Sequence, residues 1–321
     1  MENTRKQARW KSILKNRPLA LLIMTILLLV IFGIAIPRML EWSNISLILL
    51  NMSAECYVLI AMAMLLISGD IDLSLGYIMT LSGIVCGRLM IVRHAPAWAA
   101  VLAALGVCVF CGIVNGIVVA RIHVIPFIAT MATGFIYNGI ALVLAGTGYT
   151  DFPSTTFKAM GSAHVFGIQL PVYYMIVFIL VFSVLVERSR YFRQIFYIGG
   201  NSKAAEYSGI NIPRVRMNTY IISSLLVGLG GIVSTMRFNA AMTSLGSGVE
   251  MRAVTAAVIG GVSFTGGVGT IYGAAAGALF VAFLNNVLTM LNISSDFQSL
   301  VTGVVLIASI ALDVLMKRRK H

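Results

Sequence analysis

Long apolar runs, interrupted by short polar and glycine-containing stretches, dominate this chain of 321 residues. A helix that crosses a bilayer needs about 20 predominantly apolar residues. Runs near that length predict ten membrane-spanning helices, of which the eighth is short. The predicted spans cover residues 19–37, 46–67, 75–92, 97–120, 124–146, 170–186, 217–236, 253–263, 271–291 and 298–316.

The composition supports a membrane protein. Apolar residues make up 59% of the chain and charged residues 11%, whereas a soluble domain carries about 25% charged residues. We therefore predict an all-α polytopic membrane protein with one transmembrane domain over residues 19–316, a basic tail at 1–18 and another at 317–321. The four histidines are scattered and no serine has a recognisable base nearby, so we expect neither an enzyme nor a metal site.

The positive charge is concentrated in three segments. The net charge is +12, and sixteen of the 23 lysines and arginines lie in the two tails and in the segment 187–216. Basic residues accumulate in the short cytoplasmic loops of membrane proteins. Six spans before 187–216 and four after it place both termini and this segment in the cytoplasm, so the charge reports topology and no nucleic-acid partner is expected.

A polar segment, residues 197–213 (YIGGNSKAAEYSGINIP), stands out within the apolar chain. Asn201 or Ser202 can cap a short helix, Gly209 can end it, and Pro213 follows. Because so short a helix is marginal in isolation, we expect it to pack beneath the bundle or in a groove on a soluble partner. The chain contains no Walker motif, so any ATP that drives it is bound by another subunit.

Residues 68–76 (SGDIDLSLG) place two acids between glycines at the junction of the second and third spans. Carboxylates this close to hydrocarbon are costly unless they are paired, solvated or used as helix caps. Asp72 and Ser74 are plausible N-caps of the third span, and ion coupling is an alternative. The candidates for a gate or a subunit contact are Gly69, Asp70, Asp72 and Ser74.

Polar side chains inside the spans are candidates for a solute pathway. Glu55 is the most deeply embedded ionisable residue, so it either lines the pathway or is neutralised locally. The other polar groups either hydrogen-bond helix to helix or line a route for a hydroxylated solute. The pathway candidates are Glu55, Asn115, Phe127, Thr130, Asn138, Asn285 and Asn286.

Several motifs resemble one family. Residues 203–209 (KAAEYSG) resemble the Glu-Ala-Ala-x-x-x-Gly coupling loop of importer permeases, with Lys203 in place of the usual Glu. Residues 68–76 are similar to the family's Gly-Gly-Ile-Asp-Leu-Ser-Val-Gly, with Asp70 replacing a Gly. Residues 126–130 (PFIAT) and 257–267 (AVIGGVSFTGG) are similar to two further motifs. The chain therefore resembles the permease subunit of a bacterial ATP-binding-cassette importer of the ribose, xylose and allose type.

The resemblance implies an inner-membrane permease that translocates a monosaccharide or a related small hydroxylated solute by alternating access. It implies three partners: a cytoplasmic ATPase that holds ATP and magnesium, a second permease copy or paralogue, and an extracytoplasmic sugar-binding protein. The alternatives are an ion-coupled secondary transporter or facilitator, using Glu55 or the acids of residues 68–76, and a scaffolding subunit. The implied ATPase-coupling residues are Gly199, Gly200, Asn201, Lys203, Ala204, Ala205, Glu206, Gly209 and Pro213.

Overall fold

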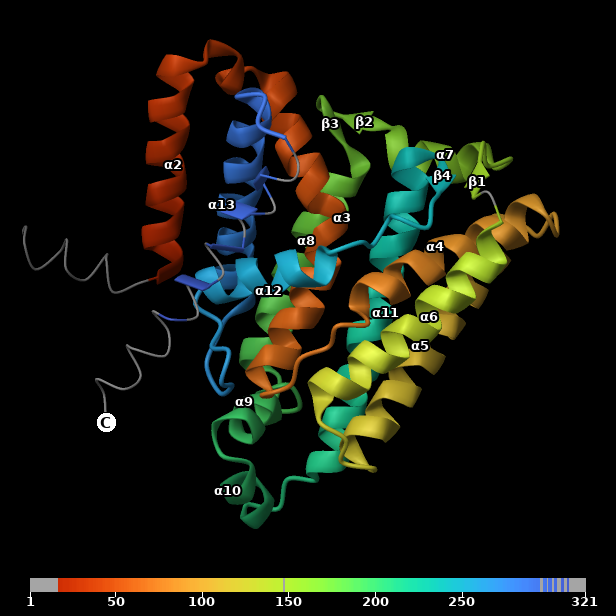
Figure 1. The fold of residues 1–321 in the computed structure, drawn as a ribbon, viewed down its shortest axis with the longest axis vertical. Helices are drawn as coiled ribbons and strands as arrows, with labels where there is room; N and C mark the ends of the chain where they lie inside the picture. Colours follow the sequence, from red (N-terminus) through yellow and green to blue (C-terminus); the bar gives the residue numbers. More distant parts are fainter. Residues whose placement is uncertain are drawn as a thin grey trace, which may run out of the picture.

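The computed structural model describes residues 17–146 and 148–294 and scattered residues between 297 and 311. Helices form most of this part of the chain (Figure 1). The helices are α2 (Arg17–Ala35), the short 3-10 helix η1 (Pro37–Leu40), α3 (Trp42–Ile67), α4 (Leu75–Ile91), α5 (Ala97–Ala120), α6 (Pro126–Ala145), α7 (Thr155–Ser162), α8 (Leu170–Arg188), α9 (Arg193–Gly200), α10 (Ser202–Tyr207), α11 (Ile212–Phe238), α12 (Val249–Ile259) and α13 (Ile271–Met290).

The prediction of an all-α, multi-pass membrane protein is confirmed. Within the described residues, six helices are long and apolar enough to cross a membrane: α3, α5, α6, α8, α11 and α13. Shorter apolar helices are found at Leu21–Ile34, within α2, and at Leu75–Ile91, which is α4. These eight helices coincide with predicted spans. The predicted tenth span, 298–316, lies largely outside the described residues.

The eighth predicted span needs correction. Helix α12 has 11 residues, from Val249 to Ile259, and the chain turns at Gly260 and Gly261. At 1.5 Å per residue it is about 16 Å long, roughly half of the hydrocarbon core of a bilayer. It packs against α3 and α13, and in Figure 1 it runs crosswise to both. By itself, α12 does not cross a membrane.

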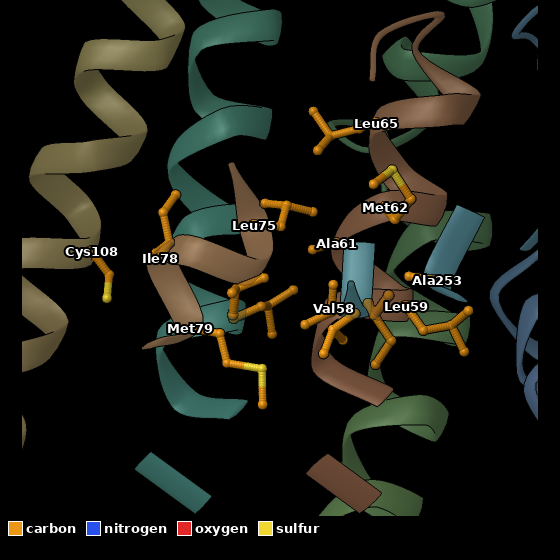
Figure 2. Close-up of a cluster of buried hydrophobic side chains, with 14 of the residues drawn as sticks. Val58, Leu59, Ala61, Met62, Leu65, Leu75, Ile78, Met79, Cys108 and Ala253 are labelled. Carbon is orange, nitrogen blue, oxygen red and sulfur yellow. The ribbon is translucent and has the colours of Figure 1, made fainter. Parts of the chain in front are cut away.

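Helices α3 and α11 form the centre of the bundle. Two thirds of the apolar stretch of each is buried, against about a fifth in α8 and a third in α5 and α6. Side chains 58–67 of α3 form a continuous buried apolar run that meets Leu75, Ile78 and Met79 of α4 (Figure 2). The outer helices keep large apolar side chains exposed, as a surface that faces lipid requires.

Glycines let the central helices approach closely. A Cβ atom added to Gly231 of α11 would overlap the Met79 carbonyl of α4, and one added to Gly277 of α13 would overlap the Ala256 carbonyl of α12. Helices in lipid associate by such close van der Waals contact. Gly231 and Gly277 therefore serve the close packing of these helices.

The two ends of the bundle differ. Helices α9 and α10 lie at one end, and η1, α7 and the small strands lie at the other (Figure 1). Strands β1 (Tyr149–Thr150) and β4 (Ala240–Ala241) form an antiparallel pair, and β2 (His164–Val165) and β3 (Ile168–Gln169) form a hairpin. Helix α7, in the connection between α6 and α8, packs on α11.

Candidate functional site

The polar segment of the sequence folds into two short helices at the basic end of the bundle. Asn201 is the N-cap of α10, and its side-chain Oδ1 accepts a hydrogen bond from the Ala204 backbone N at 3.0 Å. Asn211 caps α11 in the same way, accepting from the Arg214 backbone N at 3.0 Å, and Pro213 lies in the first turn of α11. The predicted cap at Asn201 is thus confirmed, and Asn211 is a further cap that the structure adds.

Gly209 ends α10 as the sequence predicts. Its φ is +82°, its N donates to the Glu206 carbonyl at 2.9 Å, and the Ile210 N donates to the Ala205 carbonyl at 3.1 Å. This is a Schellman arrangement, in which a left-handed glycine satisfies the last carbonyls of a helix. Only Ala205 of α10 is buried, and Tyr207 is 90% exposed. Helix α10 therefore presents an outward face that carries Lys203, Glu206 and Tyr207.

The acidic loop between α3 and α4 is buried inside the bundle. The Asp72 Oδ1 accepts from the Ser74 N at 2.7 Å and from the Ser74 Oγ at 2.6 Å, and its Oδ2 accepts from the Asn115 Nδ2 at 3.1 Å. The Tyr137 hydroxyl donates to the Asn115 Oδ1 at 3.0 Å, and the Thr130 Oγ1 accepts from the Leu73 N at 3.0 Å. This network ties the loop to α5 and α6.

Asp70, in the same loop, forms an ion pair with α11. Its Oδ2 lies 3.4 Å from the Nε of Arg216, and its side chain is 1% exposed. Burial raises the pKa of Asp70 to about 6, against the lowering effect of the Arg216 charge. Burial likewise raises the pKa of Asp72 to about 6, opposed by its hydrogen bonds from Ser74 and Asn115. Asp70 thus contacts α11, and Asp72 contacts α5.

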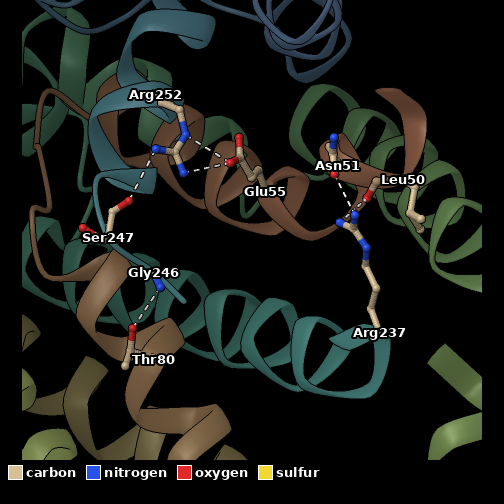
Figure 3. Close-up of polar contacts among 8 residues, drawn as sticks. All are labelled: Leu50, Asn51, Glu55, Thr80, Arg237, Gly246, Ser247 and Arg252. Carbon is tan, nitrogen blue, oxygen red and sulfur yellow. Dashed lines mark hydrogen bonds and ion pairs between the residues drawn. The ribbon is translucent and has the colours of Figure 1, made fainter. Parts of the chain in front are cut away.

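A cavity of about 400 Å³ opens between α3, α11, α12 and α13. Its wall carries two arginine contacts (Figure 3). The Arg252 Nε and Nη2 donate to the Glu55 Oε1 at 3.0 and 2.9 Å, which joins α12 to α3. The Arg237 Nη1 and Nη2 donate to the Leu50 carbonyl at 3.0 Å and the Asn51 Oδ1 at 2.6 Å, which joins α11 to α3. Glu55 therefore lines a cavity and is also neutralised.

Only three of the seven pathway candidates meet at this cavity: Glu55 from α3, and Asn285 and Asn286 from α13. Asn286 exchanges two hydrogen bonds with Asn44, at 3.1 and 2.8 Å. The other four lie elsewhere. Asn115 and Thr130 belong to the Asp72 network, while Phe127 is 45% exposed and Asn138 half-buried on α6.

The two cavity arginines, Arg237 and Arg252, are not among the candidates named from the sequence. A usable signal existed, because a carboxylate embedded in a span, such as Glu55, requires a cationic partner or water. The structure supplies the pairing that spacing along the chain does not.

A family model described as "branched-chain amino acid transport system / permease component" matches residues 45–310. The chain belongs to this permease family. Among similar curated members, the D-allose transport system permease protein of Escherichia coli K12 is 35% identical over 91% of this chain and 90% of its own length. The ribose import permease protein of the same strain is 32% identical over 91% and 92%, respectively.

The similarity extends to permeases for other solutes. The galactose/methyl galactoside import permease protein of Salmonella typhimurium LT2 is 32% identical over 92% of this chain and 94% of its own length. The autoinducer 2 import system permease protein of Photorhabdus temperata is 33% identical over 91% and 89%. No solved structure matches the chain. Family membership thus extends over nearly the whole chain, while the named solutes differ.

Proposed function

We propose that this chain is the membrane-spanning permease subunit of an ATP-binding-cassette importer for a monosaccharide or a related small hydroxylated solute. It is a transport subunit, and a separate cytoplasmic ATPase binds ATP and magnesium. The relatives named above for allose, ribose and galactose support a sugar. An extracytoplasmic sugar-binding protein and a second permease, either a copy or a paralogue, complete the importer.

The observation that carries this proposal is the exposed face of α10. A six-residue helix capped at both ends, with an aromatic side chain 90% exposed at its last position, is held in place by caps and flanking helices. A single exposed turn of this kind cannot persist by helix propensity alone. Docking Lys203, Glu206 and Tyr207 on the ATPase gives this outward face a function.

The distribution of charge supports the orientation of the chain. Arg188, Arg190 and Arg193 precede α10, and Arg214 and Arg216 follow it, at the end of the bundle opposite α7. By the positive-inside rule, we infer that this end lies in the cytoplasm of a bacterium. The protein is then a multi-pass protein of the inner membrane, and the β2–β3 hairpin faces the extracytoplasmic side.

The cavity is the proposed site at which the solute passes this subunit. Its volume of about 400 Å³ falls within the range of about 300 to 1,000 Å³ for small-molecule sites. Glu55, Arg252, Asn285 and Asn286 offer both hydrogen-bond donors and acceptors, as a polyhydroxylated solute requires. The loop that carries Gly69, Asp70, Asp72 and Ser74 lies beside α9. We propose that this loop acts as a gate of the solute pathway.

A self-contained ion-coupled carrier is less well supported. Such a carrier needs an embedded carboxylate that gains and loses a proton or a cation during transport. Glu55 is held by two hydrogen bonds from Arg252, and Asp70 is paired with Arg216. These fixed partners favour a structural role for both acids.

Copurification tests the proposal. The tagged chain is extracted in mild detergent from its native cells, and copurifying proteins are identified for the native chain and for Tyr207→Asp. Because Tyr207 is exposed, the variant should fold normally and lose the ATPase. Phe166→Asp, in the turn between β2 and β3, is the matched control, because Phe166 is an aromatic side chain that is 93% exposed and lies far from α10. Recovery of no ATPase with the intact native chain would refute the proposal.

A further inference from the structure

Three stretches of backbone, far apart in the sequence, meet at the base of α3. They are the end of α3 at Ile67 and Gly69, the last turn of α9 at Gly199, and the loop between α12 and α13 at Gly266 and Gly267. The Gly267 N donates a hydrogen bond to the Ile67 carbonyl at 2.9 Å. We call these five residues the glycine junction.

The glycine junction leaves no room for a Cβ atom at Gly199, Gly266 or Gly267. A Cβ atom added to Gly199 would overlap the Ile67 carbonyl oxygen and lie 2.6 Å from the Gly267 N. One added to Gly266 would lie 2.8 Å from the Gly199 oxygen and 3.0 Å from the Gly69 Cα. The three stretches therefore touch backbone to backbone, without a flexible side chain between them that could absorb a displacement. Close-packed interfaces of this kind shift as units instead of deforming gradually.

Each side of the glycine junction leads to a different part of the molecule. Helix α9 continues through Asn201 into α10, which is the proposed docking helix. The α12–α13 loop connects two helices that are themselves in close backbone contact, because Gly260 of α12 packs on the Gly273 carbonyl of α13. Helices α3, α12 and α13 are the walls of the cavity.

A second contact joins the coupling region to the same loop. Arg216, in the first turns of α11, pairs with Asp70, the residue after Gly69. Both flanks of α10, namely α9 and the start of α11, therefore contact residues 67–70. If a soluble partner displaces α10, the displacement reaches this loop through two contacts, one from α9 and one from α11.

We propose that the glycine junction is the joint through which movement of α10 is transmitted to the walls of the cavity, with Gly199 as its central positioning residue. The proposal rests on the proposed function, since it needs an ATPase that moves α10. It separates two roles within one motif: Gly199 faces inward and transmits movement, whereas Lys203, Glu206 and Tyr207 face outward and dock the partner.

Gly139 provides a matched control. It lies within α6, away from the coupling residues, and a Cβ atom added to it would meet nothing within 4 Å. Neither Gly199 nor Gly139 has a positive φ, and alanine raises helix propensity at both positions. Gly199→Ala differs from Gly139→Ala in that its Cβ meets Ile67 and Gly267.

The experiment uses the tagged complex purified with its ATPase and placed in lipid nanodiscs. Thr289→Cys, on the exposed cavity wall, reports the state of the cavity by its rate of labelling with a soluble maleimide. Cys56, which also lines the cavity, is replaced by Ser to remove background. Labelling rates are compared without nucleotide and after trapping with ATP and vanadate, and ATP hydrolysis is measured in parallel.

We expect the unsubstituted complex and the Gly139→Ala complex to give a clear change in labelling rate on trapping. Gly199→Ala should keep the ATPase bound and hydrolysing, while the ratio of the two rates falls to about one, because the cavity no longer follows the ATPase. An unchanged ratio in Gly199→Ala would overturn the proposal. So would loss of the ratio only together with loss of the ATPase, because that result would make Gly199 a docking residue.

Failure of the proposed function can be distinguished from failure of the glycine-junction proposal. If the unsubstituted chain neither binds an ATPase nor responds to trapping, the proposed function is refuted, whatever the behaviour of the Gly199 variant. If Gly199→Ala does not insert, Asp70→Asn carries the test, because it removes the ion pair with Arg216 without adding an atom to the glycine junction. A native labelling ratio in the folded Asp70→Asn complex would then overturn the proposal.

Discussion

The Asp72 network makes the sharpest stability prediction. Asp72 is fully buried and its carboxylate accepts three hydrogen bonds, two from Ser74 and one from Asn115. Asp72→Ala leaves two buried N–H groups without that acceptor: the Ser74 N–H and one of the two Asn115 Nδ2 hydrogens, the other of which donates to the Ser74 Oγ at 2.8 Å. An unsatisfied buried donor costs about 1–3 kcal/mol, so we expect a loss of about 2–6 kcal/mol in the free energy of unfolding.

Asp72→Asn should rank between the native chain and Asp72→Ala. The amide oxygen can still accept from the Ser74 N, but the amide nitrogen would face the Asn115 Nδ2, so one donor loses its acceptor. Asn115 cannot simply rotate its amide, because its Oδ1 accepts from the Tyr137 hydroxyl. This substitution should cost about 1–3 kcal/mol.

The assay is thermal unfolding of the purified chain in detergent at pH 7.5, above the pKa of Asp72. At about 2–4 °C per kcal/mol for large domains, Asp72→Ala should lower the unfolding temperature by at least about 4 °C. Asp151→Asn is the matched control, because Asp151 is exposed and makes an exposed hydrogen bond with Asn239. The reasoning is refuted if Asp72→Ala unfolds at the temperature of that control.

Three other variants test other parts of the account. Gly231→Ala should lower thermal stability by about 1–3 kcal/mol because its Cβ would overlap the Met79 carbonyl, whereas Gly106→Ala, with open space, should not; equal stabilities would contradict the packing argument. Glu55→Gln should reduce sugar uptake only mildly, since a partly exposed ion pair contributes about 1 kcal/mol or less, and abolished uptake measured with labelled sugar would favour ion coupling. Because the pKa of Asp70 is raised from 3.8 to about 6, the folded chain binds its proton more tightly than the unfolded chain, so thermal stability should fall as the pH rises through that window; Asp70→Asn should flatten this slope, and an unchanged slope would count against it.

Much of the helical architecture could be predicted because its signals are local. Helix α5 has the bounds that its apolar run predicts, 97–120, and α10 has the caps that Asn201 and Gly209 predict. Apolar length and capping chemistry act within a few residues of the chain. The eighth predicted span does not match the structure. Its apolar run continues past Gly260, but the helix ends there and the chain turns.

The site could be predicted only in part, because its contacts join distant residues. Glu55 is embedded in α3, but its partner Arg252 is 197 positions away. Asn115 and Thr130 look like pathway residues in the sequence, yet in the structure they hold the Asp72 loop. A polar side chain in a span indicates only that it needs a hydrogen-bonding or charged partner. The identity of that partner depends on how the helices pack.

The most direct test of the central claim is the energy source of uptake. Cells that express the complete importer are given radiolabelled ribose, allose and galactose, with ATP supplied by glycolysis. We predict that uptake requires this chain, stops when arsenate depletes ATP, and continues when an uncoupler collapses the proton gradient. Uptake that requires the chain, persists without ATP and stops with the uncoupler would contradict the account and identify a gradient-driven carrier.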